Sequence, residues 1–165
     1  MNMNLDWLDQ VNVRDVCWLA GFLDADGNIS IVKRTSYLVA VVGFTNTNKR
    51  IIDNVMRILD ALGVGYNLHY QDRGKRLNAK PAWTIKCESK PRVAKLLNLL
   101  RDDLVGKQEQ ADLVLKWCEL PSATTHKMLD GEREVRHPEG YWSIREEVQI
   151  LNHRGREPRT GLGDS

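Results

Sequence analysis

The chain contains the sequence WLAGFLDADG at residues 18–27, and this stretch decides how the rest of the chain is interpreted. Its spacing predicts the end of a helix, on which residues at i, i+3, i+4, i+7 and i+8 share one face. That face carries only short side chains, which allow another backbone to approach closely: Cys17, Ala20, Gly21, Asp24 and Ala25. Gly27 is placed to end the helix. Asp26 therefore lies at the negative end of the helix dipole, where a carboxylate needs a cation beside it.

Residues 19–27, LAGFLDADG, resemble the signature of the LAGLIDADG homing endonucleases at all nine positions. Phe22 and Leu23 are apolar variants of that signature. The chain contains one copy of it, and single-copy members of the family are homodimers, whereas two-copy members are monomers with two pseudo-symmetric halves. The resemblance therefore implies a homodimer, with the face of short side chains at its interface.

The composition is typical of a soluble globular protein, with 42% hydrophobic and 28% charged residues among 165. We expect one domain over residues 1–152 and a basic, mobile tail over 153–165. No apolar run approaches the ~18 residues that a membrane span needs. The first ten residues carry two acids and no base, which is unlike a secretory signal. Three widely spaced cysteines indicate free thiols in a reducing, intracellular compartment.

The net charge of +2 is unevenly distributed along the chain. Residues 29–86 include ten lysines and arginines but only three acids, a balance of +7, so the remainder carries −5. Such asymmetry points to a polyanionic partner for the basic segment.

Hydrophobic periodicity predicts an alternation of helices and strand pairs. Helices are expected at 13–25, 48–62, 93–100, 107–120 and 141–152, and strands at 28–34, 37–46, 66–72 and 82–88, with a polar loop at 124–140. This order is typical of an α+β domain. The resemblance implies the LAGLIDADG fold, an α-β-β-α-β-β-α core with a curved antiparallel sheet as a saddle, and extra C-terminal helices.

The resemblance also implies a set of catalytic residues. Asp26, the last acid of the signature, is expected to bind Mg²⁺ together with the Ala25 carbonyl, with Mn²⁺ as a substitute and Ca²⁺ supporting binding without cleavage. Asn46 corresponds to a polar residue that organises water, and Arg50 and Lys107 to basic residues of the pocket. The alternatives are that Asn46 is a helix N-cap and that Arg50 and Lys107 are solvated surface charges. Asp24, on the interface face, is expected to be structural.

The strand pairs are expected to bind DNA through the major groove, because the family uses the concave face of its sheet as a DNA saddle. Polar residues of the strands, their basic loop and the tail are the expected contacts: Ser30, Arg34, Tyr37, His69, Gln71, Arg73, Lys75, Arg76, Thr84, Lys86, Arg154 and Arg156. Alignment on Asn46 turns Tyr37, Val39, Val41 and Gly43 toward DNA, and the opposite parity stays open.

The predicted function is that of an intron-encoded homing endonuclease acting as a homodimer. It makes a double-strand break with short 3′ overhangs in a long, near-palindromic double-stranded DNA target. Two alternatives remain: a maturase that binds its host intron RNA, and a DNA-binding regulator with an inactive endonuclease fold. The intact Asp26 argues against the regulator, because binding alone does not need an acid beside phosphates.

Overall fold

The computed structural model describes residues 12–35, 37–72 and 80–153. Its elements follow the predicted order, with one added strand pair. They are α1 (Val13–Asp26), β1 (Asn28–Lys33), β2 (Leu38–Asn46), α2 (Lys49–Ala61), β3 (Asn67–Gln71), β4 (Ala82–Glu88), α3 (Lys90–Leu100), η2 (Arg101–Asp103), α4 (Gln108–Glu119), β5 (Thr124–Lys127), β6 (Arg133–Arg136) and α5 (Tyr141–His153). The α+β class is confirmed, and the Asn12 side chain caps α1 by accepting a hydrogen bond from the Arg14 amide.

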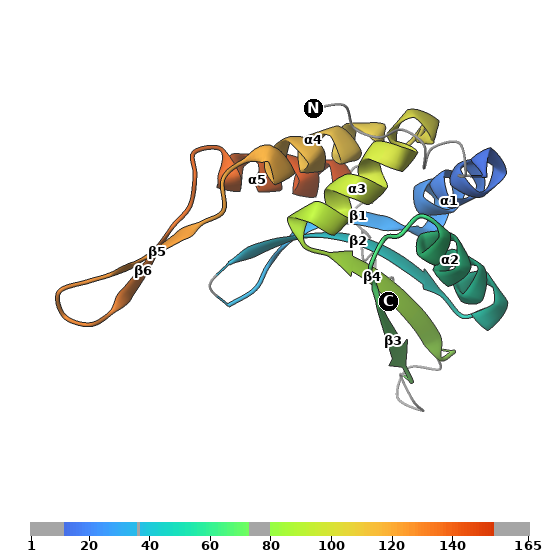
Figure 1. Cartoon of the computed structure of the whole chain (residues 1–165), viewed down its shortest axis with the longest axis horizontal. Helices are drawn as coiled ribbons and strands as arrows, with labels where there is room; N and C mark the ends of the chain where they lie inside the picture. The colour runs from blue at the N-terminus through green and yellow to red at the C-terminus, as the bar shows by residue number, and fades with distance from the viewer. Residues whose placement is uncertain (1–11, 36, 73–79, 154–165) are drawn as a thin grey trace, which may run out of the picture.

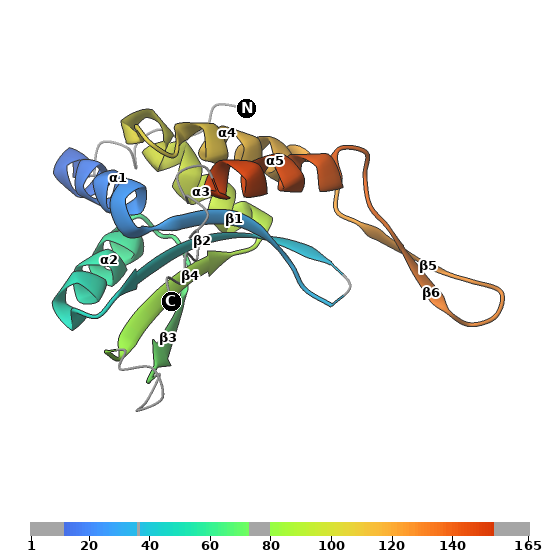
Figure 2. The same ribbon diagram turned by 180° about the vertical axis from the view of Figure 1, so that it is seen from behind.

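Four strands form an antiparallel sheet in the order β1-β2-β4-β3. Asn28 at the start of β1 lies opposite Gly43, so the end of α1 and the end of β2 meet at the same end of the sheet. The helices cover one side of this curved sheet, and the other side is left bare in Figures 1 and 2.

The hydrophobic core lies between the sheet and the helices. Alternate residues of β2 are buried in it: Leu38, Ala40, Val42 and Phe44. Val39 and Val41, between them, therefore belong to the bare face, because side chains alternate along a strand. This is the parity obtained by alignment on Asn46.

Residues 124–140 correct one prediction, since they contain a β-hairpin where the sequence suggested a polar loop. Thr124 pairs with Arg136 and Lys127 with Arg133 across β5 and β6. In the turn, the Asp130 carboxylate accepts a hydrogen bond of 3.0 Å from the Glu132 amide. All residues of the two strands are exposed except the half-buried Val135, so the strands carry no apolar alternation that a periodicity search detects. The Asp130–Gly131 pair, between short runs of residues that favour β-strands, is the sequence signal for this hairpin.

Gly27 ends α1 for a different reason from the one its position suggested. Its φ of −81° and ψ of 174° are extended, so a left-handed conformation is not what requires glycine. The requirement is space: a Cβ on Gly27 would lie 2.8 Å from both the Cα and the carbonyl oxygen of Leu23. The Gly27 amide also donates a hydrogen bond to that oxygen at 3.0 Å, which holds the two backbones together.

We predict that Gly27→Ala lowers the free energy of unfolding by about 1–3 kcal/mol, because the added methyl group meets backbone that cannot move aside. Urea denaturation at fixed protein concentration measures this loss. Gly43→Ala is the matched control, since a Cβ at Gly43 would come no nearer than 3.8 Å to any neighbouring atom and lies outside the predicted helix seam. Equal unfolding midpoints for the two variants would contradict the prediction.

Candidate active site and bare sheet face

Asp26 is the last residue of α1 and its side chain is exposed. The chain leaves the helix at Gly27 and enters β1 at Asn28, so the carboxylate lies where the helix meets the sheet. On the other side of this junction, Asn152 of α5 donates a hydrogen bond of 2.9 Å to the Ile29 carbonyl. The acid is therefore solvent-accessible on a backbone that is fixed both before and after it.

Asp24 has a different environment, although it is only two residues away. Its Oδ2 accepts hydrogen bonds from the backbone amides of Val105 at 2.6 Å and Gly106 at 3.1 Å, and its Oδ1 accepts one from the Lys107 amide at 2.9 Å. The carboxylate thus fastens the turn before α4 to the last turn of α1. This is the structural role that the sequence suggested for Asp24, exerted within one chain.

Lys107 completes the same connection in the reverse direction. Its ammonium group donates hydrogen bonds to the carbonyl oxygens of Leu23, at 2.8 Å, and of Asp24. Partial burial lowers the pKa of this lysine, while the charges of Asp24 and Asp26 act against that shift. Lys107 is therefore a partly buried cation at the negative end of α1, and the alternative of a solvated surface charge is wrong.

A cleft of about 340 Å³ opens beside Asp24 and Lys107. Its remaining lining comes from the turn before α4, the first turn of α4 and the end of α5: Gly106, Glu109, Gln110, Leu151 and Asn152. The end of α1 is thus bordered by a hollow that is mostly polar.

Asn46 and Arg50 lie at the other predicted part of the site, where β2 passes into α2. The Asn46 side-chain oxygen accepts a hydrogen bond of 2.8 Å from the Asn48 amide. Asn48, in turn, caps α2 by accepting one of 3.0 Å from the Arg50 amide. The N-cap is therefore Asn48, and Asn46 shapes the turn before it. The Arg50 residue is exposed in the first turn of α2.

The outward face of α1 matches the predicted stripe in three of its five positions. Cys17, Gly21 and Ala25 are exposed, at a spacing of four residues. Asp24 is half-buried under the turn just described, and Ala20 corrects the prediction: its exposed fraction is 0%, because it packs into the chain's own core. Val13, which is 72% exposed, extends the stripe by one turn. Its position four residues before Cys17 is the signal that the prediction missed.

The predicted DNA contacts on the strands all fall on the bare face of the sheet. Cross-strand pairs place Lys86 beside Asn67 and Thr84 beside His69, while Ser30 lies opposite Val41. Tyr37 and Gln71 are exposed at the strand ends. The Thr45 and Thr84 hydroxyls lie 2.9 Å apart on this face.

Arg34 is paired with an acid that sequence reasoning did not select. Its guanidinium lies 2.6 Å from a carboxylate oxygen of Glu88 at the end of β4. Glu88 lies opposite Val41, so it shares the bare face with Lys86 and Thr84, and that shared parity was the available signal. The ion pair fixes the direction of Arg34 and also neutralises part of its charge.

Five of the predicted DNA contacts lie outside the described residues: Arg73, Lys75, Arg76, Arg154 and Arg156.

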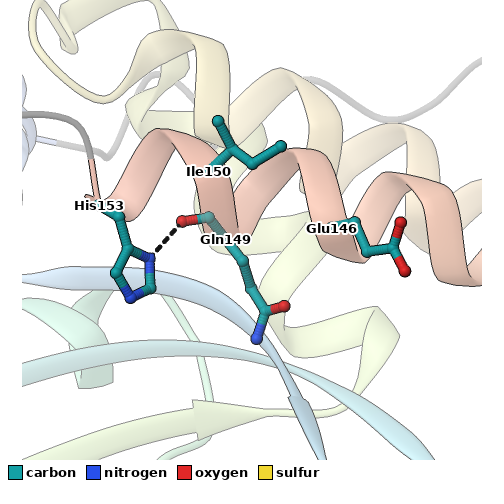
Figure 3. A pocket seen from close by; sticks show the side chains of 4 residues that line it. All are labelled: Glu146, Gln149, Ile150 and His153. Carbon is teal, nitrogen blue, oxygen red and sulfur yellow. Dashed lines mark hydrogen bonds between the residues drawn. The ribbon is translucent and has the colours of Figure 1, made fainter.

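A second cleft, on α5, is lined by Glu146, Gln149, Ile150 and His153 (Figure 3). His153 points back to the Gln149 carbonyl, 2.6 Å away, so it closes the last turn of the helix. This cleft shares no lining residue with the hollow at Asp24.

Within residues 12–35, 37–72 and 80–153, no three His, Cys, Asp or Glu side chains form a group that could hold a metal ion. Within the described residues of one chain, Asp26 therefore has no further acidic, histidine or cysteine side chains grouped with it as metal ligands. In the same residues, no helix is both long and apolar enough to cross a membrane.

The chain thus combines an exposed acid at the end of a helix, a partly buried lysine bound to that helix end and a curved sheet with one bare side (Figure 1). The family model for the LAGLIDADG-like domain matches residues 15–114. The chain belongs to this family.

Solved structures support the same fold. The homing endonuclease I-CvuI in complex with its target, in the presence of Ca²⁺, matches with a TM-score of 0.61 and 20% identity over 89% of each chain. I-CvuI with another target, in the presence of Mg²⁺, matches with a TM-score of 0.57 and 21% identity, again over 89% of each chain. The homing endonuclease I-GzeII with its DNA target gives 0.51 and 12%, over 84% of this chain and 44% of that one.

One curated relative is an uncharacterized protein of Methanocaldococcus jannaschii, 32% identical over 60 residues. The match covers 36% of this chain and 23% of that protein, so the chain spans well under half of the relative's length.

We predict that Asp24→Ala lowers the free energy of unfolding by about 1.5–3 kcal/mol, because three backbone amides lose a charged acceptor. Denaturation followed by circular dichroism measures the change. The exposed Asp26 provides the control: Asp26→Ala is expected to change the same quantity by less than about 0.5 kcal/mol. An equal loss in both variants would show that the turn before α4 does not depend on Asp24.

Proposed function

We propose that the chain is a site-specific DNA endonuclease that cleaves both strands of a long, near-palindromic duplex with a divalent metal ion, leaving short 3′ overhangs. The observation that carries this proposal is the placement of Asp26. It is exposed at the end of a helix whose last turn is fixed by Asp24 and Lys107, and it lies next to a bare curved sheet. An acid held in this way beside a surface that fits DNA is suited to phosphodiester chemistry.

The oxygen donors at this position fit a hard divalent cation such as Mg²⁺. The Asp26 carboxylate and the Ala25 carbonyl would hold it. Lys107 binds the Leu23 and Asp24 carbonyls, so it occupies the acceptors just before Ala25 and orients the helix end. A bound divalent ion lowers the pKa of its water and stabilises the leaving oxygen in hydrolysis of a phosphodiester. Ca²⁺ would support binding without cleavage, and Mn²⁺ would substitute for Mg²⁺.

A homodimer supplies what one chain lacks. The stripe of Cys17, Gly21 and Ala25 is exposed, small and flanked by Val13, so a second α1 can pack against it. Because Asp26 lies one residue beyond Ala25, pairing two such helices brings two acids together, one for each DNA strand.

The bare face of the sheet supplies recognition. β2 has nine residues and β4 seven, which at ~3.3 Å per residue span about 30 and 23 Å. Those lengths correspond to roughly nine and seven base pairs at ~3.4 Å each. Lys86 and the Glu88-paired Arg34 share this face and are the proposed contacts to base edges in the major groove, while Thr84 is 8% exposed and its hydroxyl contacts that of Thr45.

The three cysteines are free thiols, with Cys87 buried and Cys118 half-buried. Thiols that form no disulfide fit a reducing compartment inside a cell, where we place the protein. Burial raises the pKa of Cys87 to about 12 and that of Cys118 to about 11, so both are poor nucleophiles at neutral pH.

Selection from a randomised duplex library, followed by a nicking assay with Mg²⁺, distinguishes the endonuclease from its alternatives. The proposal requires cleavage of both strands at one selected sequence. Specific binding without cleavage in any divalent metal would favour the regulator, and preference for a structured RNA over every duplex would favour the maturase.

We predict that Asp26→Asn abolishes cleavage and leaves specific binding in Ca²⁺ within about threefold, because the change removes a charged metal ligand but keeps shape and fold. Cleavage is measured on the selected duplex and binding by fluorescence anisotropy. The matched control is Asp53→Asn, a change at an exposed acid on α2 whose partner is Lys49, which should cleave normally. Full cleavage by Asp26→Asn would remove this residue from the catalytic site.

We predict that Gly21→Leu separates the dimer without unfolding the chain. Within one chain the new side chain has open space, since nothing lies within 4 Å of a Cβ at Gly21, whereas a close-packed helix seam cannot absorb it. Light scattering should show half the mass of the wild-type protein, and circular dichroism an unchanged helix content. Lys116→Leu, at an exposed position of α4, is the control for added bulk. A dimer that survives Gly21→Leu would place the interface elsewhere.

A further inference from the structure

We propose that the β5–β6 hairpin extends the DNA-binding surface beyond the sheet, and that Lys127 and Arg133 bind backbone phosphates of double-stranded DNA there. This inference rests on the proposed function. It concerns residues that lie beyond the 15–114 segment matched by the family model.

The hairpin is an arm rather than part of the body. Figures 1 and 2 show it projecting from the ends of α4 and α5, away from α1 and past the end of β1 and β2. In both views its tip drops below the level of α4 and α5, toward the side on which no helix covers the sheet. If two α1 helices meet at the centre of the complex, each arm lies at an outer end.

The pairing register gives the two faces of the arm different charge. On one face, Arg136 makes a 2.9 Å ion pair with Glu134, and the Thr124 hydroxyl lies 3.1 Å from the His126 ring. On the other face, Lys127 lies directly opposite Arg133. Among the described residues, neither of these two side chains has an acidic partner.

Like charges directly opposite each other destabilise a strand pair, so the Lys127–Arg133 face is unfavourable for the isolated chain. An anion between the two cations removes that repulsion. A DNA backbone supplies anions at regular spacing, and it already lies near the arm if the bare sheet holds a duplex. Because charge and position agree, we choose the duplex rather than RNA or a protein as the partner.

The arm has a suitable length for this contact. Its strands have four residues each, about 13 Å at ~3.3 Å per residue. That distance corresponds to roughly four base pairs at ~3.4 Å each. The arm therefore adds about four base pairs to the outer end of each half-site, through phosphates and without reading bases.

The first test changes the DNA and uses the wild-type protein. Affinity for the selected duplex is measured against salt concentration in Ca²⁺, with the full duplex and with one shortened to the length that the sheet covers. Each phosphate contact contributes a slope of about 0.9 in log K against log salt. The shortened duplex should lower the slope by roughly two units per subunit, for two lost contacts.

The second test changes the arm. Lys127→Ala with Arg133→Ala should give, on the full duplex, the slope and the footprint that the wild type gives on the shortened one. On the shortened duplex this double variant should match the wild type. The control is Glu134→Ala with Arg136→Ala, which changes the opposite face without changing net charge and should keep the wild-type footprint.

Each outcome decides the proposal. Loss of the outer footprint in the double variant, with cleavage of the selected site retained, supports it. If the wild type cleaves specifically and the Lys127→Ala, Arg133→Ala variant keeps the wild-type salt slope and footprint, the proposal for the hairpin is wrong while the proposed function stands. Equal loss of the outer footprint in both double variants shows an effect on hairpin structure alone and contradicts the assignment of phosphate contacts to Lys127 and Arg133. If the wild type binds no duplex at all, both this proposal and the proposed function are wrong. If Lys127 and Arg133 matter for RNA binding only, the proposal for the hairpin is wrong.

Discussion

The structure depends on a reciprocal set of hydrogen bonds between the end of α1 and the turn before α4. Asp24 accepts from three successive backbone amides of that turn, while Lys107 donates to two successive carbonyls of the helix. Asp24 therefore satisfies amides of the turn, and Lys107 adds a donor at the Leu23 carbonyl, which also accepts from the Gly27 amide, and at the Asp24 carbonyl. The lysine also places positive charge at the negative end of the helix dipole. Segments more than 80 residues apart in sequence are joined at the point where Asp26 emerges.

The same connection explains why neighbouring acids have different roles. Helix geometry turns Asp24 toward the chain's own turn, and Asp26, two residues later, away from it. Asp24 accepts hydrogen bonds from three amides, whereas the carboxylate oxygens of Asp26 stay accessible to solvent. Lys107 affects both without pairing with either carboxylate, because its hydrogen bonds go to main-chain carbonyls. It is best described as a positioning residue that holds the helix end, and its charge lowers the cost of placing an acid there.

Hydrophobic periodicity, together with the residues that end helices and form turns, predicted most of the fold. Elements with one buried face were predicted nearly to their observed ends, as with β4 and α2, because burial leaves a pattern in the sequence. The β5–β6 hairpin was missed because it buries neither face. The candidate site was predicted in parts: the motif singled out Asp26, but no local pattern shows that Lys107 binds the end of α1 or that Glu88 pairs with Arg34. Those contacts join distant segments, and only the folded chain brings them together. Ala20 was misassigned because helix spacing gives a face but not its exact width.

The size of the side chains on the outer face of α1 differs between its two ends. Large side chains of its inner face, such as Leu19 and Leu23, are fully buried in the core. On the outer face, Val13 lies at the start of the helix, while Gly21 and Ala25 lie near its end. Two copies packed on that face are therefore kept apart at their N-termini and can approach closely at their C-termini, since the smaller residues set the distance between the axes. In the proposed homodimer the two helices would therefore converge toward Asp26, and the same size gradient would set how closely the two proposed metal-binding acids approach.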